Sequence, residues 1–272
     1  MRRIIVLLIV SIQTAYSGFE LRSNDARSAA LGGAMTGMTE NGWSLFVNPA
    51  GMGHFDGSEV DFSFSPQLFG IAGLSDIGFA AVSKTAIGSI GIRVQRFGNT
   101  LYRELTTTIG YARALDGFGV GIALHRYSVT IERYGSASTL GVDLGIQVRF
   151  LHSVRWGISL HNVNAPTIGA AKEKLPQQFQ AGVVYLPDQN LRFTFDAQKQ
   201  TAAEFSLRCG VEYALSVITL RAGFSEEPSE ISGGFGIQLS SLQFDYGMTY
   251  HSVLGWTHRG SISFRISGGS HE

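Results

Sequence analysis

One pattern repeats over most of this chain. From about Glu59 to Ile266, blocks of roughly ten residues alternate apolar side chains with polar or very small ones, and short turns separate the blocks. The clearest block is 142–150. Its apolar row is Val142, Leu144, Ile146, Val148 and Phe150, and its polar or small row is Asp143, Gly145, Gln147 and Arg149. Successive side chains of a strand point to opposite faces, so such a block has one apolar and one wet face. Strands of this kind, closed into a ring, make a barrel with lipid outside and polar groups inside.

The blocks predict about fourteen strands, and therefore an all-β fold that is a transmembrane antiparallel β-barrel over residues 59–266, with a tail at 267–272. The strands are expected near 59–69, 73–83, 87–97, 101–114, 118–132, 138–150, 153–162, 177–187, 190–200, 203–214, 217–225, 231–239, 241–250 and 258–266. If the first strand runs outward, the short connections are periplasmic and several longer ones are external, which is the usual asymmetry. The fifth block changes phase near His125-Arg126, which predicts a β-bulge there.

A soluble sandwich is the alternative, because it too alternates and because 44% hydrophobic residues is an ordinary fraction. Two features favour the membrane. The blocks are longer than common sandwich strands, and aromatic residues gather near block ends as in the interfacial girdles of barrels. These aromatic residues are Phe69, Phe97, Tyr102, Tyr134, Phe150, Tyr185, Tyr250 and Trp256.

The first seventeen residues have the features of a secretory signal peptide. Met1-Arg2-Arg3 is positively charged, Ile4 to Val10 is apolar, and Ala15-Tyr16-Ser17 offers a small-residue cleavage site before Gly18. A short membrane anchor is the other interpretation, but the apolar stretch falls well below the roughly 20 residues that a spanning helix needs.

Residues 18–58 do not alternate. Asn24 or Asp25 can cap a short helix over 26–31 that Gly32-Gly33 ends, and the turn-forming run Asn48, Pro49, Ala50 and Gly51 follows. The segment is too small to bury a core of its own. We therefore expect a short N-terminal helical plug inside or beneath the barrel, with the Asn48–Gly51 turn as its gate.

The composition argues against several classes of function. Net charge is zero and charged residues make up 15% of the chain, so no basic nucleic-acid surface is indicated. The 34 glycines suit tight turns and a crowded lumen. Cys209 is the only cysteine and falls in an apolar row, where we expect it to face lipid or to pack.

No catalytic group or cofactor site stands out, so we do not expect an enzyme. His251 and His258 share a predicted outer loop, and Glu226, Glu227 and Glu230 form an acidic loop, but in both cases solvated loop chemistry is the plainer interpretation than a metal site. The Gly-Phe-Gly-Val-Gly run at 117–121 resembles a phosphate loop, yet no helix follows it.

Charged residues occupy the polar rows and should point into the lumen. They are Arg93, Asp143, Arg149, Arg155, Arg192, Asp196, Glu204, Arg208, Glu212, Arg221, Asp245 and Arg265. One interpretation is a structural network that fills the interior and holds the plug, because buried charges persist when they are paired. The other is a lining that selects a solute.

Both ends of the chain resemble a known family. The run from Asp25 to Ala34, the run from Ser44 to Gly51, and the closing run from Leu254 to Ile266 are similar to PorV/PorQ-like barrels, relatives of the FadL outer-membrane transporters. The resemblance implies a fourteen-stranded barrel in the bacterial outer membrane, with an N-terminal segment in its lumen. FadL-type members pass hydrophobic molecules, whereas PorV-type members serve type IX secretion and hold cargo or partner proteins.

We therefore expect an outer-membrane barrel that transports hydrophobic small molecules. A barrel that binds secretion-system or cargo proteins is the alternative, and a soluble secreted β-protein is the second alternative. The expected partners are outer-membrane lipid together with a hydrophobic small molecule or a protein, and no nucleic acid.

Overall fold

The computed structural model describes residues 18–20, 22–23, 25–38, 41–151, 153–201 and 203–266. The predicted signal peptide at 1–17 and the predicted tail at 267–272 lie outside the described residues.

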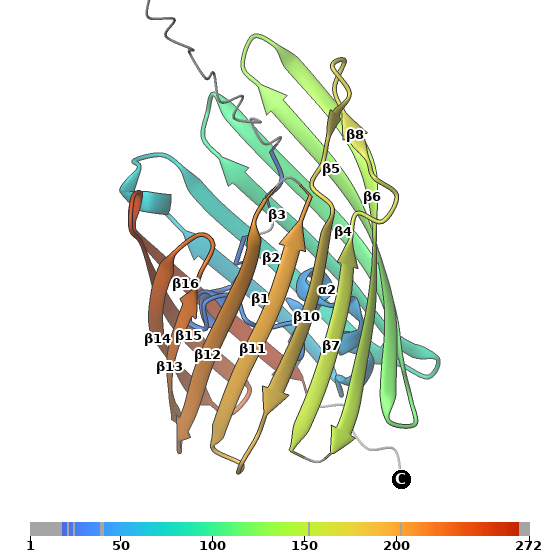
Figure 1. Cartoon of the computed structure of the whole chain (residues 1–272), viewed down its shortest axis with the longest axis vertical. Coiled ribbons are helices and arrows are strands. Elements are labelled where there is room, and N and C mark those ends of the chain that lie inside the picture. The colour runs from blue at the N-terminus through green and yellow to red at the C-terminus, as the bar shows by residue number, and fades with distance from the viewer. Residues whose placement is uncertain are drawn as a thin grey trace, which may run out of the picture.

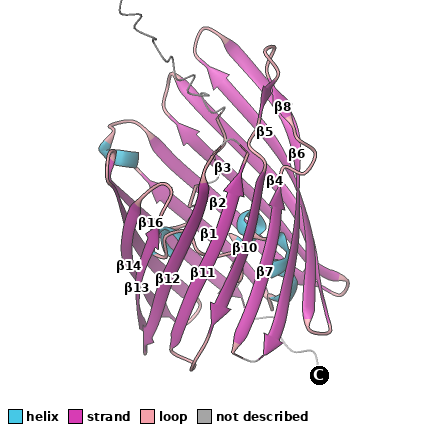
Figure 2. Ribbon diagram, in the orientation of Figure 1, coloured by secondary structure: helices cyan, strands magenta, loops and turns pink. Residues whose placement is uncertain are grey.

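A single closed antiparallel sheet of fourteen strands forms the wall (Figures 1 and 2). Each strand pairs with its neighbours in the chain, and β1 pairs with β16 to close the ring. The strands are β1 (Ser58–Ser65), β2 (Ser75–Thr85), β3 (Gly88–Gly98), β4 (Tyr102–Leu115), β5 (Phe118–Ile131), β6 (Gly135–Leu151), β7 (Val154–His161), β10 (Gln178–Tyr185), β11 (Leu191–Gln200), β12 (Phe205–Leu215), β13 (Ile218–Ser225), β14 (Glu230–Leu239), β15 (Leu242–His251) and β16 (Gly255–Ile266). The predicted fold class and strand number are confirmed.

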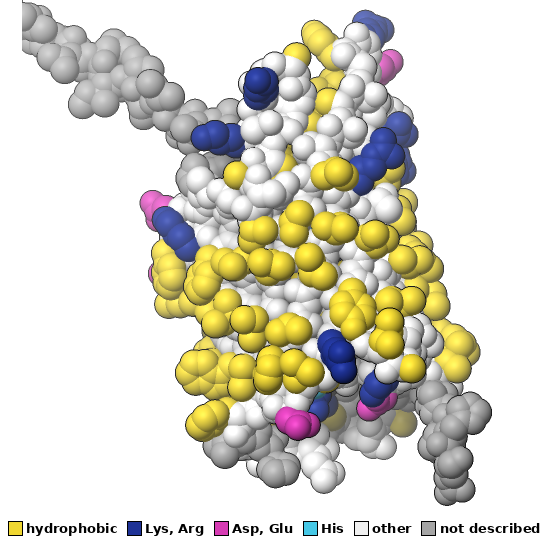
Figure 3. All heavy atoms as spheres, turned by 90° about the vertical axis from the view of Figure 1, so that its right-hand side faces the viewer, with side chains coloured by type: hydrophobic (Ala, Val, Ile, Leu, Met, Phe, Trp, Pro, Cys, Tyr) yellow, Lys and Arg dark blue, Asp and Glu magenta, His cyan; other side chains and the backbone are white. Residues whose placement is uncertain are grey.

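The apolar rows lie on the outside of the ring. Val60, Phe62 and Phe64 of β1 are 40–46% exposed, whereas Asp61 and Ser63 between them are fully buried. Figure 3 shows the result on one face, where hydrophobic side chains form a band with Lys and Arg above and below it. In a sandwich these rows would pack against one another, so the structure excludes the sandwich. Among the helices of the described residues, none has the length and apolarity to cross a bilayer.

The N-terminal segment fills the lumen (blue in Figure 1). Its elements are α1 (Ala26–Ala30), α2 (Ser44–Val47) and the 3-10 helix η1 (Pro49–His54). Asp25 caps α1 in a reciprocal capping box with Ser28, and Gly32 and Gly33 follow the helix with φ of 64° and 76°. We call residues 18–57 the plug. Helix α1 packs on β13–β16 and η1 packs on β3–β6, so the plug touches opposite sides of the wall.

Inward-facing glycines let the plug backbone approach the wall. A Cβ atom on Gly223 of β13 would lie 2.3 Å from the backbone of Leu31 and Gly32, and one on Gly157 of β7 would lie 2.0 Å from the carbonyl oxygen of Thr36. Real Cβ atoms do not approach other atoms this closely, so glycine is required at both positions.

The wall is taller on one side. Strands β4 and β5 have 14 residues each and β6 has 17, compared with 8 in β13, and this side rises above the rest of the rim (Figure 1). Beside it stands a small two-stranded sheet of β8 (Thr167–Ile168) and β9 (Glu173–Lys174), and the short 3-10 helix η2 (Leu68–Gly70) lies at the same rim on the opposite side of the barrel, next to β16.

The β-bulge predicted near His125-Arg126 is wrong. The register of β5 with both neighbours runs without a break through these residues, and the only irregularity of β6 lies between Arg149 and Leu151. The apolar residues of β5 change from the outward to the inward face because the surroundings of the strand change at this level. Below this level the outward row is apolar and meets lipid, whereas above it Tyr127 turns inward and packs with Phe19, Ile168 and Leu175 as a small core of the tall wall.

The close contact between Gly223 and the plug predicts that a larger side chain at this position displaces the plug from the wall. A Gly223→Val substitution should push Leu31 and Gly32 off β13 and destabilise the folded barrel by about 1–3 kcal/mol, because the wall has no room for the methyl groups. The measurement is protease sensitivity of the plug together with heat-modifiable gel migration.

Gly233→Val on the adjacent strand β14 is the matched control, since its nearest neighbour atom is 3.7 Å away. Equal protease sensitivity of the two variants would contradict the tight fit of plug and wall.

Candidate functional site

The predicted gate lies deep in the lumen. Pro49, Ala50 and Gly51 begin η1 and are buried against Gly121 of β5 and Gly145 of β6. Asn48 is fully buried, and its side-chain amide donates to the carbonyl oxygens of Thr36 at 2.9 Å and Ile146 at 3.1 Å, while its Oδ1 accepts from the N–H of Ala50 at 3.2 Å. The Asn48 side chain therefore joins two parts of the plug to the wall.

Carboxylates of the wall satisfy backbone donors of the plug. Asp196 of β11 accepts from the N–H groups of Met35 and Thr36 at 2.9 and 2.8 Å, and from the Thr36 hydroxyl at 2.6 Å. On the far side, Glu59 and Asp61 of β1 accept from the N–H of Gly42 at 3.0 and 3.2 Å. The irregular plug backbone thus finds in wall side chains the partners that a helix or sheet would supply.

Glu212 of β12 is the centre of a charge cluster. It accepts two hydrogen bonds of 2.8 Å from the guanidinium of Arg27 in α1, one of 2.6 Å from Arg221 and one of 2.9 Å from Arg192. Arg221 also donates to Asp245 at 2.7 Å. One plug arginine and two wall arginines therefore share two carboxylates, which ties α1 to β11–β15.

A second polar cluster lies within the wall. Asp143 of β6 lies 2.8 Å from Nε2 of His125 and 2.7 Å from Nδ1 of His161, and it also accepts from the N–H of Asn162 at 2.8 Å. The hydroxyl of Thr108 is 2.8 Å from Nδ1 of His125. In the described part of the chain, no group of three or more His, Cys, Asp and Glu side chains is arranged to hold a metal ion.

The remaining predicted lumen residues differ in depth. Arg93 is fully buried with its guanidinium carbon 4.1 Å from the centre of the Phe46 ring of the plug, whereas Arg149 is exposed at the rim with the short turns. Arg155, Arg192 and Arg208 are half-buried. Glu204 is exposed on the opposite rim, and Arg265 pairs with Glu59 at 2.7 Å.

Several buried residues of the interior were not singled out from the sequence. They are Glu59, Asp61, Asp76, His125, His161 and Arg259. Each lies in the polar row of its strand, so its inward direction follows from the alternation, but its partner on another strand does not. Arg259 and Asp76, for example, are 183 residues apart and form a 3.0 Å ion pair.

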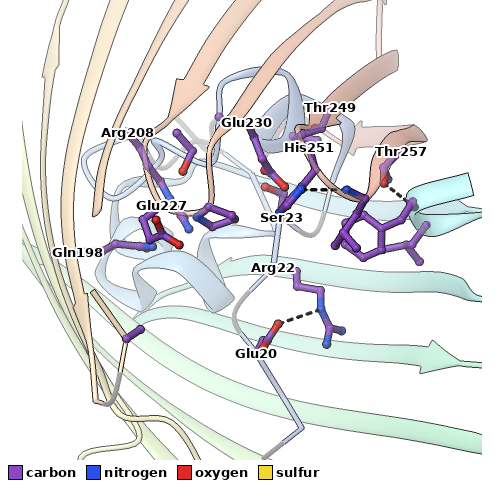
Figure 4. A pocket seen from close by; sticks show the side chains of 18 of the residues that line it. Glu20, Arg22, Ser23, Gln198, Arg208, Glu227, Glu230, Thr249, His251 and Thr257 are labelled. Atoms are coloured by element: carbon purple, nitrogen blue, oxygen red, sulfur yellow. Dashed lines mark hydrogen bonds and ion pairs between the residues drawn. The ribbon is translucent and has the colours of Figure 1, made fainter. Parts of the chain in front are cut away.

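Above the plug, at the rim with the longer loops, the lumen opens into a cavity of about 560 Å³ that we call the vestibule (Figure 4). Its floor includes plug residues such as Arg22 and Ser23, and its walls come from β11 to β16 and η2. Charged and apolar groups share the lining, which includes Glu20, Glu204, Glu227, Glu230, Arg22, Arg208, Arg259 and His251 together with Leu68, Phe69, Pro228 and Leu254.

The foot of the plug carries a histidine among positive charges. Burial, together with the positive charges of Arg149, Arg155 and Lys84, lowers the pKa of His54 to about 4. His54 is therefore neutral at neutral pH, and protonation would add a positive charge near Arg149, Arg155 and Lys84.

Comparison with known proteins supplies the fold relatives. No protein-family model matches the chain, and no curated protein sequence matches it. Among solved structures, the chain is similar to a TodX monoaromatic hydrocarbon channel deltaS2 mutant (TM-score 0.72, 10% identity, 92% of this chain and 100% of that chain). It is also similar to a Pseudomonas aeruginosa FadL homologue (TM-score 0.68, 11% identity, 92% and 100%) and to the Pseudomonas putida toluene transporter TodX (TM-score 0.65, 10% identity, 90% and 97%). The chain thus shares the fold of FadL-type barrels, and the resemblance to PorV/PorQ stays a prediction.

The Glu212 cluster predicts a large loss of stability on neutralisation. Glu212→Gln leaves Arg27, Arg192 and Arg221 facing one another, and breaking such a buried pair costs about 3–5 kcal/mol. Urea unfolding in detergent measures the effect. Glu204→Gln at the exposed rim is the control and should change stability little; equal effects of the two variants would show that the cluster does not hold the plug.

His54 predicts a pH dependence with a defined sign. Between the ordinary histidine pKa near 6.5 and about 4, the unfolded chain binds a proton at His54 that the folded chain does not, so stability falls as pH falls through this window and is unaffected above it. Urea unfolding at pH 7 and pH 4.5 should therefore show a larger loss for the native chain than for His54→Gln. Identical losses would contradict this role of His54.

Proposed function

We propose that this protein is an outer-membrane channel for hydrophobic small molecules, with the vestibule as its entrance and the plug as its gate. The observation that carries the proposal is the arrangement of a closed, lipid-facing barrel whose lumen is filled by its own N-terminal segment beneath an open cavity. The FadL-type fold relatives, one of them described as a monoaromatic hydrocarbon channel and another as a toluene transporter, support it.

The vestibule suits a molecule with a large apolar part. Leu68, Phe69, Pro228 and Leu254 line it on the side of η2 and the last loops, and they offer apolar contact at the mouth. Charged side chains occupy the rest of the lining, so a polar end of the same molecule would find partners there. Passage beyond the vestibule requires that the plug move, because α1 and η1 pack directly on the wall.

The polar contacts that hold the plug can be replaced by contacts with water. Its backbone N–H groups donate to carboxylates and the Asn48 amide donates to the carbonyl oxygen of Thr36, and water can replace such polar partners when a segment shifts. The Asn48–Gly51 turn lies at the junction of α2 and η1, where a change of backbone direction needs few residues. We therefore keep Asn48, Pro49, Ala50 and Gly51 as the proposed gate.

The binding of secretion-system or cargo proteins stays the alternative proposal. Crosslinking from the loop at 252–254, between β15 and β16, would capture a protein partner in that case. The channel proposal predicts uptake by the barrel alone, which separates the two.

A reversible lock tests the gate. Gly42 of the plug lies beside Ala80 of β2, where a Cβ atom on Gly42 would be 3.4 Å from that of Ala80, close to the Cβ separation of a disulfide. The same Cβ would be 2.3 Å from Oδ2 of Asp61, so the Asp61 carboxylate must rotate aside, an effect that the Gly42→Cys single variant measures separately. A Gly42→Cys/Ala80→Cys pair, with Cys209→Ser to remove the native thiol, should lower uptake of radiolabelled toluene or oleate when oxidised and restore it on reduction. Intact cells without an endogenous hydrophobic channel are needed, since apolar molecules cross phospholipid vesicles unaided.

The single-cysteine variants and a hydrophilic sugar are the controls. Uptake that equals that of cells without the protein would contradict the channel, and uptake that is the same in the oxidised and reduced pair would contradict a moving plug.

A further inference from the structure

Charge is divided between the two faces of the barrel wall. Every carboxylate on a barrel strand lies at an inward position; these are Glu59, Asp61, Asp76, Glu104, Asp143, Asp196, Glu212, Glu230 and Asp245. At the outward positions of the described barrel strands, every charged residue is a cation; these residues are Arg96, Arg103, Arg113, Arg126 and Lys199. Along the barrel strands, the outward positions are therefore positive wherever they are charged.

Three of these cations are neighbours on the tall side of the wall. Arg96 of β3 pairs in register with Leu105 of β4. Arg103 lies two residues before Leu105 on β4, and Arg126 of β5 pairs with Thr107, two residues after it. Leu105 thus has Arg96 directly beside it, Arg103 two residues away on its own strand, and Arg126 diagonally across on β5. From strand spacing and rise, their Cα atoms fall within roughly 15 Å of one another.

The three arginines mark the end of the apolar band. Each is the first charged outward residue after an apolar one, since Arg96 follows Val94, Arg126 follows Leu124, and Arg103 lies beyond Leu105. Arg103 and Arg126 are exposed and Arg96 is half-buried, and no carboxylate of the described residues forms an ion pair with any of the three. Figure 3 shows cationic side chains at this upper border of the band.

We propose that Arg96, Arg103 and Arg126 form a binding site for the phosphorylated saccharide headgroup of an outer-leaflet glycolipid. The inference rests on the proposed placement in the outer membrane with the longer loops outward. A guanidinium group can donate two parallel hydrogen bonds to the oxygens of one phosphate. At the edge of the hydrocarbon, the attraction between arginine and phosphate is less screened than in water.

A glycolipid fits better than a phospholipid with one phosphate. The Cα atoms of the three arginines span up to roughly 15 Å along and across the strands, a spread that a saccharide carrying several phosphates matches better than one phosphate does. Above the arginines the outward row of the tall wall is hydroxylated, with Ser128 and Thr130 on β5 and Ser136 and Ser138 on β6, and these groups can bind sugar hydroxyls. The acyl chains would lie on the apolar row below.

The test compares lipid binding by the purified full-length barrel in detergent. The probes are diphosphorylated lipid A, the same lipid A after removal of its phosphates, and phosphatidylglycerol, with retention measured by native mass spectrometry. The Arg96→Gln/Arg103→Gln/Arg126→Gln variant should bind diphosphorylated lipid A at least roughly tenfold more weakly than the native chain, because charged hydrogen bonds to phosphate are lost. The native affinity should also fall as salt rises, and that of the variant should not.

Arg113→Gln is the matched control, since Arg113 is an exposed outward arginine of the same strand β4 near the opposite rim. Equal binding by the triple variant and Arg113→Gln, with both shown folded by heat-modifiable migration, would overturn the site. Equal native binding of dephosphorylated lipid A or phosphatidylglycerol would overturn the assignment to a phosphorylated glycolipid. Uptake of toluene measured in parallel distinguishes this failure from failure of the channel, because none of the three arginines lines the lumen.

Discussion

Hydrocarbon offers no hydrogen-bond partners, and this constraint governs the whole molecule. Every backbone group of the wall must pair with a neighbouring strand, which closes the sheet, and every outward side chain at that depth must be apolar. Polar residues can then go only inward. The chain follows this division so strictly that the carboxylates of its barrel strands all face the lumen.

Inward charges create a second requirement, because a buried charge without a partner is costly. The plug provides ion-pair and hydrogen-bond partners for charged side chains of the wall, and these side chains satisfy the backbone N–H groups of the plug. Arg27 meets Glu212, while the backbone N–H groups of Met35, Thr36 and Gly42 meet Asp196, Glu59 and Asp61. The plug and the barrel are therefore one structure, in which each satisfies polar groups of the other, and any passage through the lumen requires these contacts to exchange.

Much of this fold was predictable from alternation alone. Strand positions follow from the period of two, and the inward direction of Asp143, Glu212 or Arg221 follows from the same period. The partners do not, because pairing of Glu212 with Arg27 joins residues 185 apart and depends on how the plug enters the lumen. The change of phase at His125-Arg126 did not reveal its cause for a physical reason: a bulge and an exit from the membrane both move apolar residues to the other face, and the sequence does not distinguish them. The small core around Phe19 and the β8–β9 sheet depend on that exit and were missed with it.

The three tryptophans of the chain sample the two environments on which the account depends. Trp43 lies in the plug and is 2% exposed, whereas Trp156 of β7 and Trp256 of β16 point outward and are 54% and 49% exposed. Fluorescence quenching by lipids with brominated acyl chains, measured on single-tryptophan variants of the reconstituted barrel, tests the division directly. The account predicts strong quenching of Trp156 and Trp256 and little quenching of Trp43; quenching of Trp43 as strong as that of Trp156 would contradict it.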